Sequence, residues 1–183
     1  MKKIILRNGV LAGLIVGIPM FLYMTSIPEH GSMGASMLLT YVVMLLALSM
    51  VFVGIKQYRD RELGGVIQFV PALAVGLGIS VVAGVLYAIA WEITMPMMKF
   101  DFTQFYANSM LEQARARGAS AAELAAAATK AEEFTRTYAN PLIRVPFTFL
   151  EIFPVGILVS LVSAALLRNS RFMPMKRSAA GGA

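Results

Sequence analysis

Four long apolar stretches dominate the sequence and limit what it can fold into. They run over about residues 10–27, 36–55, 66–93 and 142–167. Each approaches or exceeds the ~20 residues that an α-helix needs to cross the hydrocarbon core of a bilayer. The stretches are continuous instead of alternating, and they are longer than barrel strands need to be. The sequence therefore predicts an all-α integral membrane four-helix bundle in a single domain over residues 1–167, followed by a basic tail over 168–183.

The composition narrows the class of protein further. Hydrophobic residues make up 58% of the chain and charged residues 14%, against roughly 45–50% and 25% in soluble domains. The chain has no cysteine and only one histidine, His30, which excludes disulfides, iron–sulfur clusters and metal sites built on thiolates or several histidines. We expect no cofactor and no metal. Basic residues bracket the apolar stretches, so the net charge of +6 does not indicate a nucleic-acid partner.

The basic residues also predict how the chain crosses the membrane. One side carries ten of them against two acids, Asp60 and Glu62. The ten are Lys2, Lys3, Arg7, Lys56, Arg59, Arg61, Arg168, Arg171, Lys176 and Arg177. The other side balances six basic residues with six acidic ones, including Glu29. By the positive-inside rule we expect both termini and the 56–65 loop in the cytoplasm, in a multi-pass protein of the bacterial cytoplasmic (inner) membrane.

The one long polar stretch, residues 95–140, predicts a helical hairpin on the periplasmic side. Asp101 with Gln104, and Ser120 with Glu123, have the spacing of a capping box at a helix start. Gly118 stands where a left-handed residue would end the first helix. Apolar residues recur at three- and four-residue intervals in both halves. The hairpin packs on itself and on the mouth of the bundle, or it offers a docking surface to a partner protein.

Small residues recur at intervals of four in three of the apolar stretches. They are Gly9, Gly13 and Gly17 in the first, Ala72, Gly76, Ser80, Gly84 and Ala88 in the third, and Gly156, Ser160 and Ala164 in the fourth. In lipid, helices associate through such close backbone approach because little hydrophobic force acts between them. The stripes predict helix packing, either within one bundle or between the protomers of a homo-oligomer.

Two glutamates, Glu92 and Glu151, interrupt apolar stretches. Glu92 continues the small-residue stripe of the third stretch, and Arg144 precedes Glu151 by seven positions, on the same helix face. We therefore predict a partly buried polar cluster at the outer end, with both carboxylates turned toward their own bundle. Its other candidate members are three tyrosines, Tyr23, Tyr41 and Tyr87. The cluster is a clamp that fixes helix register, or a site for an ion, a proton or a substrate.

Four segments have the most distinctive sequences in the chain. They are GIKQYRDRELGGVIQF at 54–69, YAIAWEI at 87–93, NPLIR at 140–144 and FLEIFPVGILVSLVSAALL at 149–167. In these segments the chain resembles the bacterial membrane family known as domain of unknown function 4199, from the first apolar stretch to Leu167. The resemblance implies a small inner-membrane protein with four helices and an outer helical insertion, and it implies no activity. The family motifs hold Glu92, Glu151 and the sequence Tyr58-Arg59-Asp60.

Three classes of function fit these patterns. We favour an accessory or structural membrane protein that packs with itself or with a membrane-protein partner, and we expect no enzyme and no catalytic residue. The alternative is a small ion- or proton-coupled transporter or channel that uses Glu92 and Glu151. An enzyme that modifies lipid at the outer leaflet is the third, although the sequence has no P-loop, zinc-protease or nucleophile-elbow motif.

Overall fold

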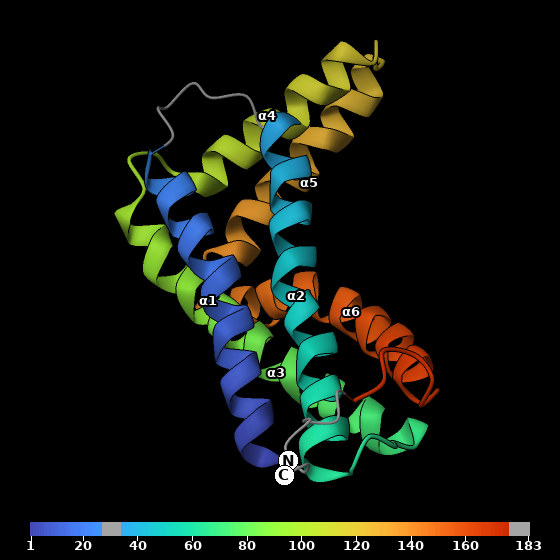
Figure 1. Cartoon of the computed structure of the whole chain (residues 1–183). Coiled ribbons are helices and arrows are strands. Elements are labelled where there is room, and N and C mark those ends of the chain that lie inside the picture. Colours follow the sequence, from blue (N-terminus) through green and yellow to red (C-terminus); the bar gives the residue numbers. More distant parts are fainter. Residues whose placement is uncertain (27–33, 176–183) are drawn as a thin grey trace, which may run out of the picture.

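A computed structural model of the chain describes the backbone of residues 1–26 and 34–175, and the side chains of 1–26 and 41–175. The helices are α1 (Lys2–Ser26), α2 (Gly34–Glu62), α3 (Phe69–Thr94), the 3₁₀ turn η1 (Met95–Met97), α4 (Phe102–Ala116), α5 (Ala121–Tyr138) and α6 (Pro141–Leu167) (Figure 1). These residues contain no strand. Glu29, His30, Lys176 and Arg177 lie outside the described residues.

The four predicted apolar helices are confirmed. Lys2–Ser26, Tyr41–Glu62, Phe69–Met97 and Pro141–Leu167 are each long and apolar enough to span a membrane, with mean hydropathies of 1.9, 1.7, 2.3 and 2.2. Two helices are longer than their apolar stretches, since α1 already begins at Lys2 and α2 continues to Glu62. The apolar stretch indicates only the part of a helix that suits hydrocarbon. The helix itself can extend beyond that part, because backbone hydrogen bonds also form between polar residues.

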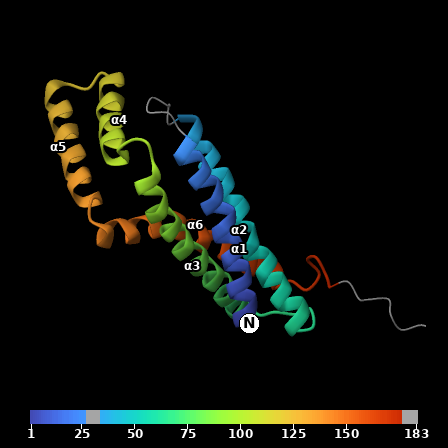
Figure 2. The same ribbon diagram turned by 90° about the vertical axis from the view of Figure 1, so that its left-hand side faces the viewer.

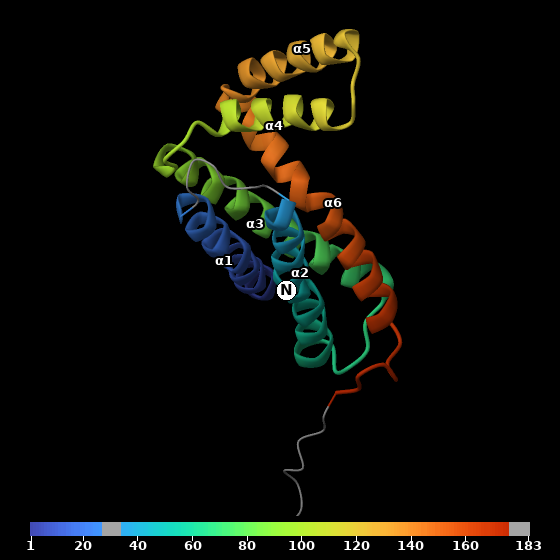
Figure 3. The same ribbon diagram turned by 90° about the horizontal axis from the view of Figure 1, so that it is seen from above.

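The helix α3 forms the centre of the bundle. It packs between α1 and α6, and α2 packs against all three from one side (Figures 2 and 3). Buried aliphatic residues of α2, α3 and α6 make the core; the fully enclosed ones include Leu48, Val51, Ile55, Val75, Ile79 and Ile152. The opposite side of α3 carries no helix of its own bundle, and Val85, Ile89 and Ile93 are exposed there.

The glycine stripe of α1 faces α3. A Cβ atom on Gly9 would lie 2.6 Å from the Cβ of Val82, and one on Gly13 would lie 2.6 Å from the Cβ of Leu86. Both distances are far below van der Waals contact, so only glycine allows the two backbones to approach this closely. The partner of this stripe is therefore a helix of the same chain.

The small-residue stripes of α3 and α6 face each other. A Cβ on Gly76 would lie 2.8 Å from Ser160 Oγ, and one on Gly156 would lie 2.7 Å from the Cβ of Ser80. Both serine hydroxyls donate to backbone carbonyls one turn earlier, at 3.0 Å for Ser80 and 2.7 Å for Ser160. Gly84 meets the ring of Phe149 in the same seam. These stripes are therefore used within the chain, and pairing between protomers stays a prediction.

The hairpin of α4 and α5 forms as its capping residues predict. Asp101 accepts hydrogen bonds from the backbone N–H groups of Thr103 and Gln104, at 2.9 and 3.2 Å. Ser120 and Glu123 form a reciprocal capping box at the start of α5. Gly118 ends α4 with φ of 72°, a left-handed conformation that favours glycine. Local sequence signals are sufficient here because each cap involves residues only two or three positions apart.

The basic segments of the chain gather at the end opposite the hairpin (Figure 2). The amino group of Met1 lies 2.6 Å from the carboxylate of Glu62, which brings the start of α1 to the end of α2. Arg59 donates to the carbonyls of Phe172 and Met173 at 2.9 and 2.6 Å, which brings the segment after α6 to the same place. The grouping that underlies the predicted orientation is thus present in the fold.

Candidate functional site

The main polar site lies where the hairpin joins the bundle, and its centre is Arg144. The side chain of Asn140 accepts from the backbone N–H of Leu142 at 3.0 Å, and α6 begins with Pro141. Both features fix the start of the helix. Arg144 therefore lies in the first turn of α6, and there it is buried, with 9% of its surface exposed.

Arg144 binds Glu92 with two parallel hydrogen bonds. The guanidinium donates from Nε to Oε1 at 2.6 Å and from Nη2 to Oε2 at 2.5 Å. Its third nitrogen, Nη1, donates to the backbone carbonyl of Tyr138 at 3.1 Å, one of the final carbonyls of α5 that have no partner within the helix. One side chain thus connects α3, α5 and α6. Because the guanidinium is planar and donates two parallel hydrogen bonds, the pair fixes the relative orientation of the two side chains in addition to neutralising their charges.

Aromatic rings extend this site into the hairpin. Trp91 and Phe102 form a T-shaped pair with ring centroids 4.8 Å apart, and the Tyr138 ring centroid lies 5.8 Å from the Arg144 guanidinium carbon. Tyr106 and Phe134 continue the contact between α4 and α5, at 4.6 Å. Burial raises the pKa of Tyr138 to about 12, so its hydroxyl is neutral at physiological pH. The site is therefore a packed joint between the hairpin and the spanning helices.

Glu151 makes no hydrogen bond to Arg144 or Glu92 among the described contacts, so the two carboxylates do not share one cluster. Glu92 is half-buried against Arg144, whereas Glu151 is exposed on α6. Its described contact is a long hydrogen bond from the Tyr87 hydroxyl, at 3.4 Å. The buried stripe of α6 runs through Thr148 and Ile152. Each residue advances about 100° around a helix, so Glu151 stands beside that stripe instead of on it.

The predicted tyrosines do not form one cluster. Tyr87 is buried and reaches Glu151. Tyr23 shares with Tyr87 the lining of a small pocket of about 50 Å³ between α1, α2 and α3. Tyr41 is exposed on α2, with 55% of its surface accessible. The six predicted residues therefore separate into the Glu92–Arg144 pair, the Glu151–Tyr87 pair with Tyr23 next to Tyr87, and Tyr41 by itself.

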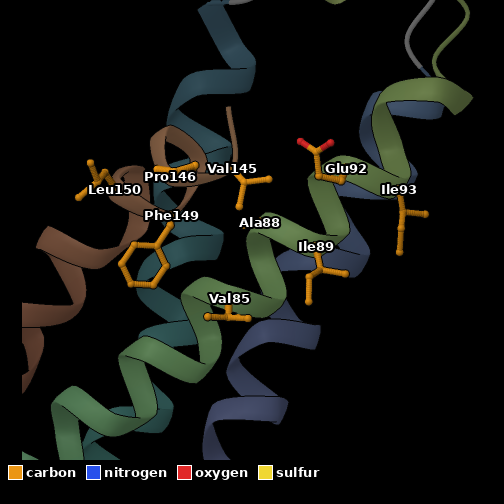
Figure 4. A pocket seen from close by; sticks show the side chains of 9 residues that line it. All are labelled: Val85, Ala88, Ile89, Glu92, Ile93, Val145, Pro146, Phe149 and Leu150. Atoms are coloured by element: carbon orange, nitrogen blue, oxygen red, sulfur yellow. The ribbon is translucent and has the colours of Figure 1, made fainter. Parts of the chain in front are cut away.

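Two grooves follow the sides of α3, and both are apolar. The larger, of about 670 Å³, lies between α3 and α6 and has Glu92 as its one polar lining residue (Figure 4). The smaller, of about 290 Å³, lies between α1 and α3 and is lined by aliphatic residues and Phe21. Neither of these two grooves forms a polar path from a glutamate into the bundle. The described residues also contain no group of acids and histidines that could hold a metal ion.

A second polar site lies at the basic end, around the Tyr58-Arg59-Asp60 motif. Arg59 is fully buried although it comes from a basic, polar stretch. Its Nε donates to Asp60 at 2.7 Å, while its other nitrogens reach carbonyls at and after the end of α6, including that of Leu167 at 3.4 Å. Sequence reasoning placed this motif in the cytoplasm and did not detect that it binds α6.

Asn8 makes a buried polar contact that the sequence patterns did not predict. It is 1% exposed, and it donates to the carbonyl of Ile4 at 2.8 Å and to Gln57 Oε1 at 3.1 Å. Arg7 donates to the same oxygen at 2.5 Å, so α1 and α2 are joined by hydrogen bonds near the basic end. The spacing of the sequence could have indicated this burial, because Asn8 stands four residues before Ala12 and therefore on the same, buried face of α1.

Comparison with known proteins gives the chain its family. The family model described as Protein of unknown function (DUF4199) matches residues 7–169. The chain belongs to this family. The match covers the helices α2 to α6, most of α1, the Glu92–Arg144 site and the Arg59 side of the second polar site, and it ends before Phe172 and Met173. Searches of curated proteins and of solved structures found no match.

Proposed function

We propose that this DUF4199 chain is an accessory protein of the bacterial cytoplasmic membrane, without catalytic turnover, whose bundle holds the α4–α5 hairpin in a fixed orientation for a partner protein. The observation that carries the proposal is the double hydrogen bond between Arg144 and Glu92. It joins the hairpin to two spanning helices at once, since the same guanidinium holds the Tyr138 carbonyl. A clamp of this kind favours a rigid joint over a moving gate.

The distribution of charge supports the orientation in this proposal. The start of α1, the end of α2 and the described residues after α6 meet at one end of the bundle and carry most of the basic residues that the structure describes. The positive-inside rule assigns such an end to the cytoplasm. The hairpin then stands in the periplasm, together with the Glu92–Arg144 pair at its base.

The hairpin has a surface that suits a partner. A groove of about 400 Å³ runs between α4 and α5. Its lining combines the apolar side chains of Ala107, Leu111, Ala128 and Ala131 with the polar ones of Gln104, Asn108, Glu132, Thr135 and Arg136. A concave surface that mixes apolar and polar groups suits a segment of another protein.

Packing inside the membrane part also supports a role without transport. Ser80 and Ser160 direct their hydroxyls to backbone carbonyls within a tight seam, and Glu92 is occupied by Arg144. Within the described parts of the chain, no serine or threonine hydroxyl hydrogen-bonds to either glutamate. Neither an ion path nor an activated nucleophile is supported by these contacts.

The test measures the orientation of the hairpin and the flux through the protein together. The chain has no cysteine. Spin labels therefore attach only to cysteines that are introduced at exposed positions, Glu112→Cys in α4 and Leu166→Cys in α6. We expect a narrow distance distribution in lipid vesicles that broadens in Glu92→Gln and stays narrow in Glu133→Gln, a matched exposed glutamate of α5. Proton or cation flux above that of empty vesicles, lost in Glu92→Gln, would refute the proposal.

A further inference from the structure

The exposed face of α6 carries one carboxylate in otherwise apolar surroundings. Glu151 shares this face with Phe147 and Leu158, which are 58% and 61% exposed. It lies seven residues beyond Arg144, about 10 Å further along the helix toward the basic end. This position is inside the segment that is long and apolar enough to span the membrane. Hydrocarbon is a costly environment for a carboxylate, and such residues in spanning helices usually have partners.

The two glutamates of the spanning helices differ in what neutralises them. Glu92 has the guanidinium of Arg144 at 2.5 Å. Glu151 has only the neutral hydroxyl of Tyr87, at 3.4 Å, and no cation within salt-bridge distance among the described residues. Among the described residues, the chain thus supplies a counter-charge for Glu92 and none for Glu151.

The neighbouring helix α2 is also exposed in part. The helices α2 and α6 pack against each other, and α2 exposes Tyr41 and Leu45 at 55% each. Among these two side chains and the three named on α6, the polar groups are the Glu151 carboxylate and the Tyr41 phenol. We name these exposed side chains, Tyr41, Leu45, Phe147, Glu151 and Leu158, the α2–α6 face.

We infer that the α2–α6 face docks a transmembrane helix of another protein, and that this helix carries a lysine or arginine at the depth of Glu151. Charge complementarity identifies the occupant, because a carboxylate without a cation of its own is matched by a basic side chain. A second copy of the chain fits less well. The basic residues of the described spanning helices lie near the helix ends, and Arg144 is already bound to Glu92. This contact lies within the bilayer and is independent of the hairpin groove.

The experiment uses a synthetic partner of known sequence. The full-length protein, labelled at Glu112→Cys, is reconstituted in lipid vesicles with a leucine-rich transmembrane peptide that carries an acceptor dye and one lysine. Energy transfer measures association for lysines placed at successive depths and for an all-leucine peptide. We expect the lysine peptide of matching depth to bind roughly three- to thirty-fold more tightly than the all-leucine peptide, as found for single polar contacts between helices in lipid.

Two variants locate the effect. Glu151→Gln is expected to remove most of the preference for lysine, with unchanged helix content. Glu151→Leu combined with Leu158→Glu moves the carboxylate by seven residues on the same helix face, so the preferred lysine depth is expected to shift by about 10 Å. Equal binding of the lysine and leucine peptides would overturn the inference. Self-association of the wild-type protein that Glu151→Gln abolishes would also overturn it, because a second copy would then occupy the face.

Discussion

The strongest test of the joint at Arg144 is a double-mutant cycle with Glu92. Glu92→Leu leaves a guanidinium that is 9% exposed at the residue level without its counter-charge. Removing one partner of a buried ion pair costs about 3–5 kcal/mol. The Glu92 side chain is 26% exposed, so solvent at this site relieves part of the cost. We therefore expect Glu92→Leu to lower the free energy of unfolding by about 3 kcal/mol. Arg144→Met removes the cation from a carboxylate that water reaches more easily, so a smaller loss of about 2 kcal/mol is expected.

The double variant is expected to be more stable than either single variant. With both charges gone, the site is apolar, and apolar replacements of whole ion pairs are often neutral. The carbonyl of Tyr138 still loses its donor, which costs roughly 1 kcal/mol. Thermal unfolding in detergent measures the cycle, with a fall of about 2–4 °C for each kcal/mol in a chain of this size. Losses that simply add, to about 5 kcal/mol, would refute the reasoning that the two side chains act as a pair.

Three further predictions concern other parts of the molecule. Gly13→Val forces an isopropyl group into Leu86 and is expected to destabilise the protein by about 1–3 kcal/mol in thermal unfolding. Arg59→Gln is expected to release the segment after α6, so that limited proteolysis cuts the chain there. Arg61→Gln, at an exposed position, is expected to leave that segment uncut. Hydrogen bonds from the Thr103 hydroxyl and the α4 backbone lower the pKa of Asp101. Its contribution to stability is therefore present above the unfolded pKa, ~3.9, and lost as pH falls through the lower folded value; amide exchange in α4 measures this loss.

Each of these predictions has a result that contradicts it. Wild-type stability of Gly13→Val would mean that α1 does not approach α3 this closely. Equal proteolysis of the Arg59 and Arg61 variants would show that Arg59 does not hold the C-terminal segment. For the third, an Asp101→Asn variant that keeps the full pH dependence of α4 exchange would assign the effect to another group.

Local patterns in the sequence were sufficient for the elements of this fold. Apolar length identified four helices, because the requirement to match hydrocarbon acts on each helix by itself. Capping residues identified the hairpin, since Ser120 and Glu123 satisfy each other within one turn. The period of four also placed Glu92 on the packed face of α3, where it was found. The basic residues identified which ends meet, and the contact of Arg59 with the segment after α6 agrees with that grouping.

The contacts between helices required the tertiary structure. The spacing of Gly13 or Gly156 indicates a close approach but not the helix that approaches, and only the packed chain shows α3 in both cases. Arg144 and Glu151 lie on similar faces of one helix, yet the crossing of α3 brings Glu92 to the arginine and leaves Glu151 exposed. Hydrophobicity and capping are properties of a single segment, so the sequence determined the helices. The rotation of each helix toward its neighbours depends on all of them together, and it alone decided which polar side chains meet.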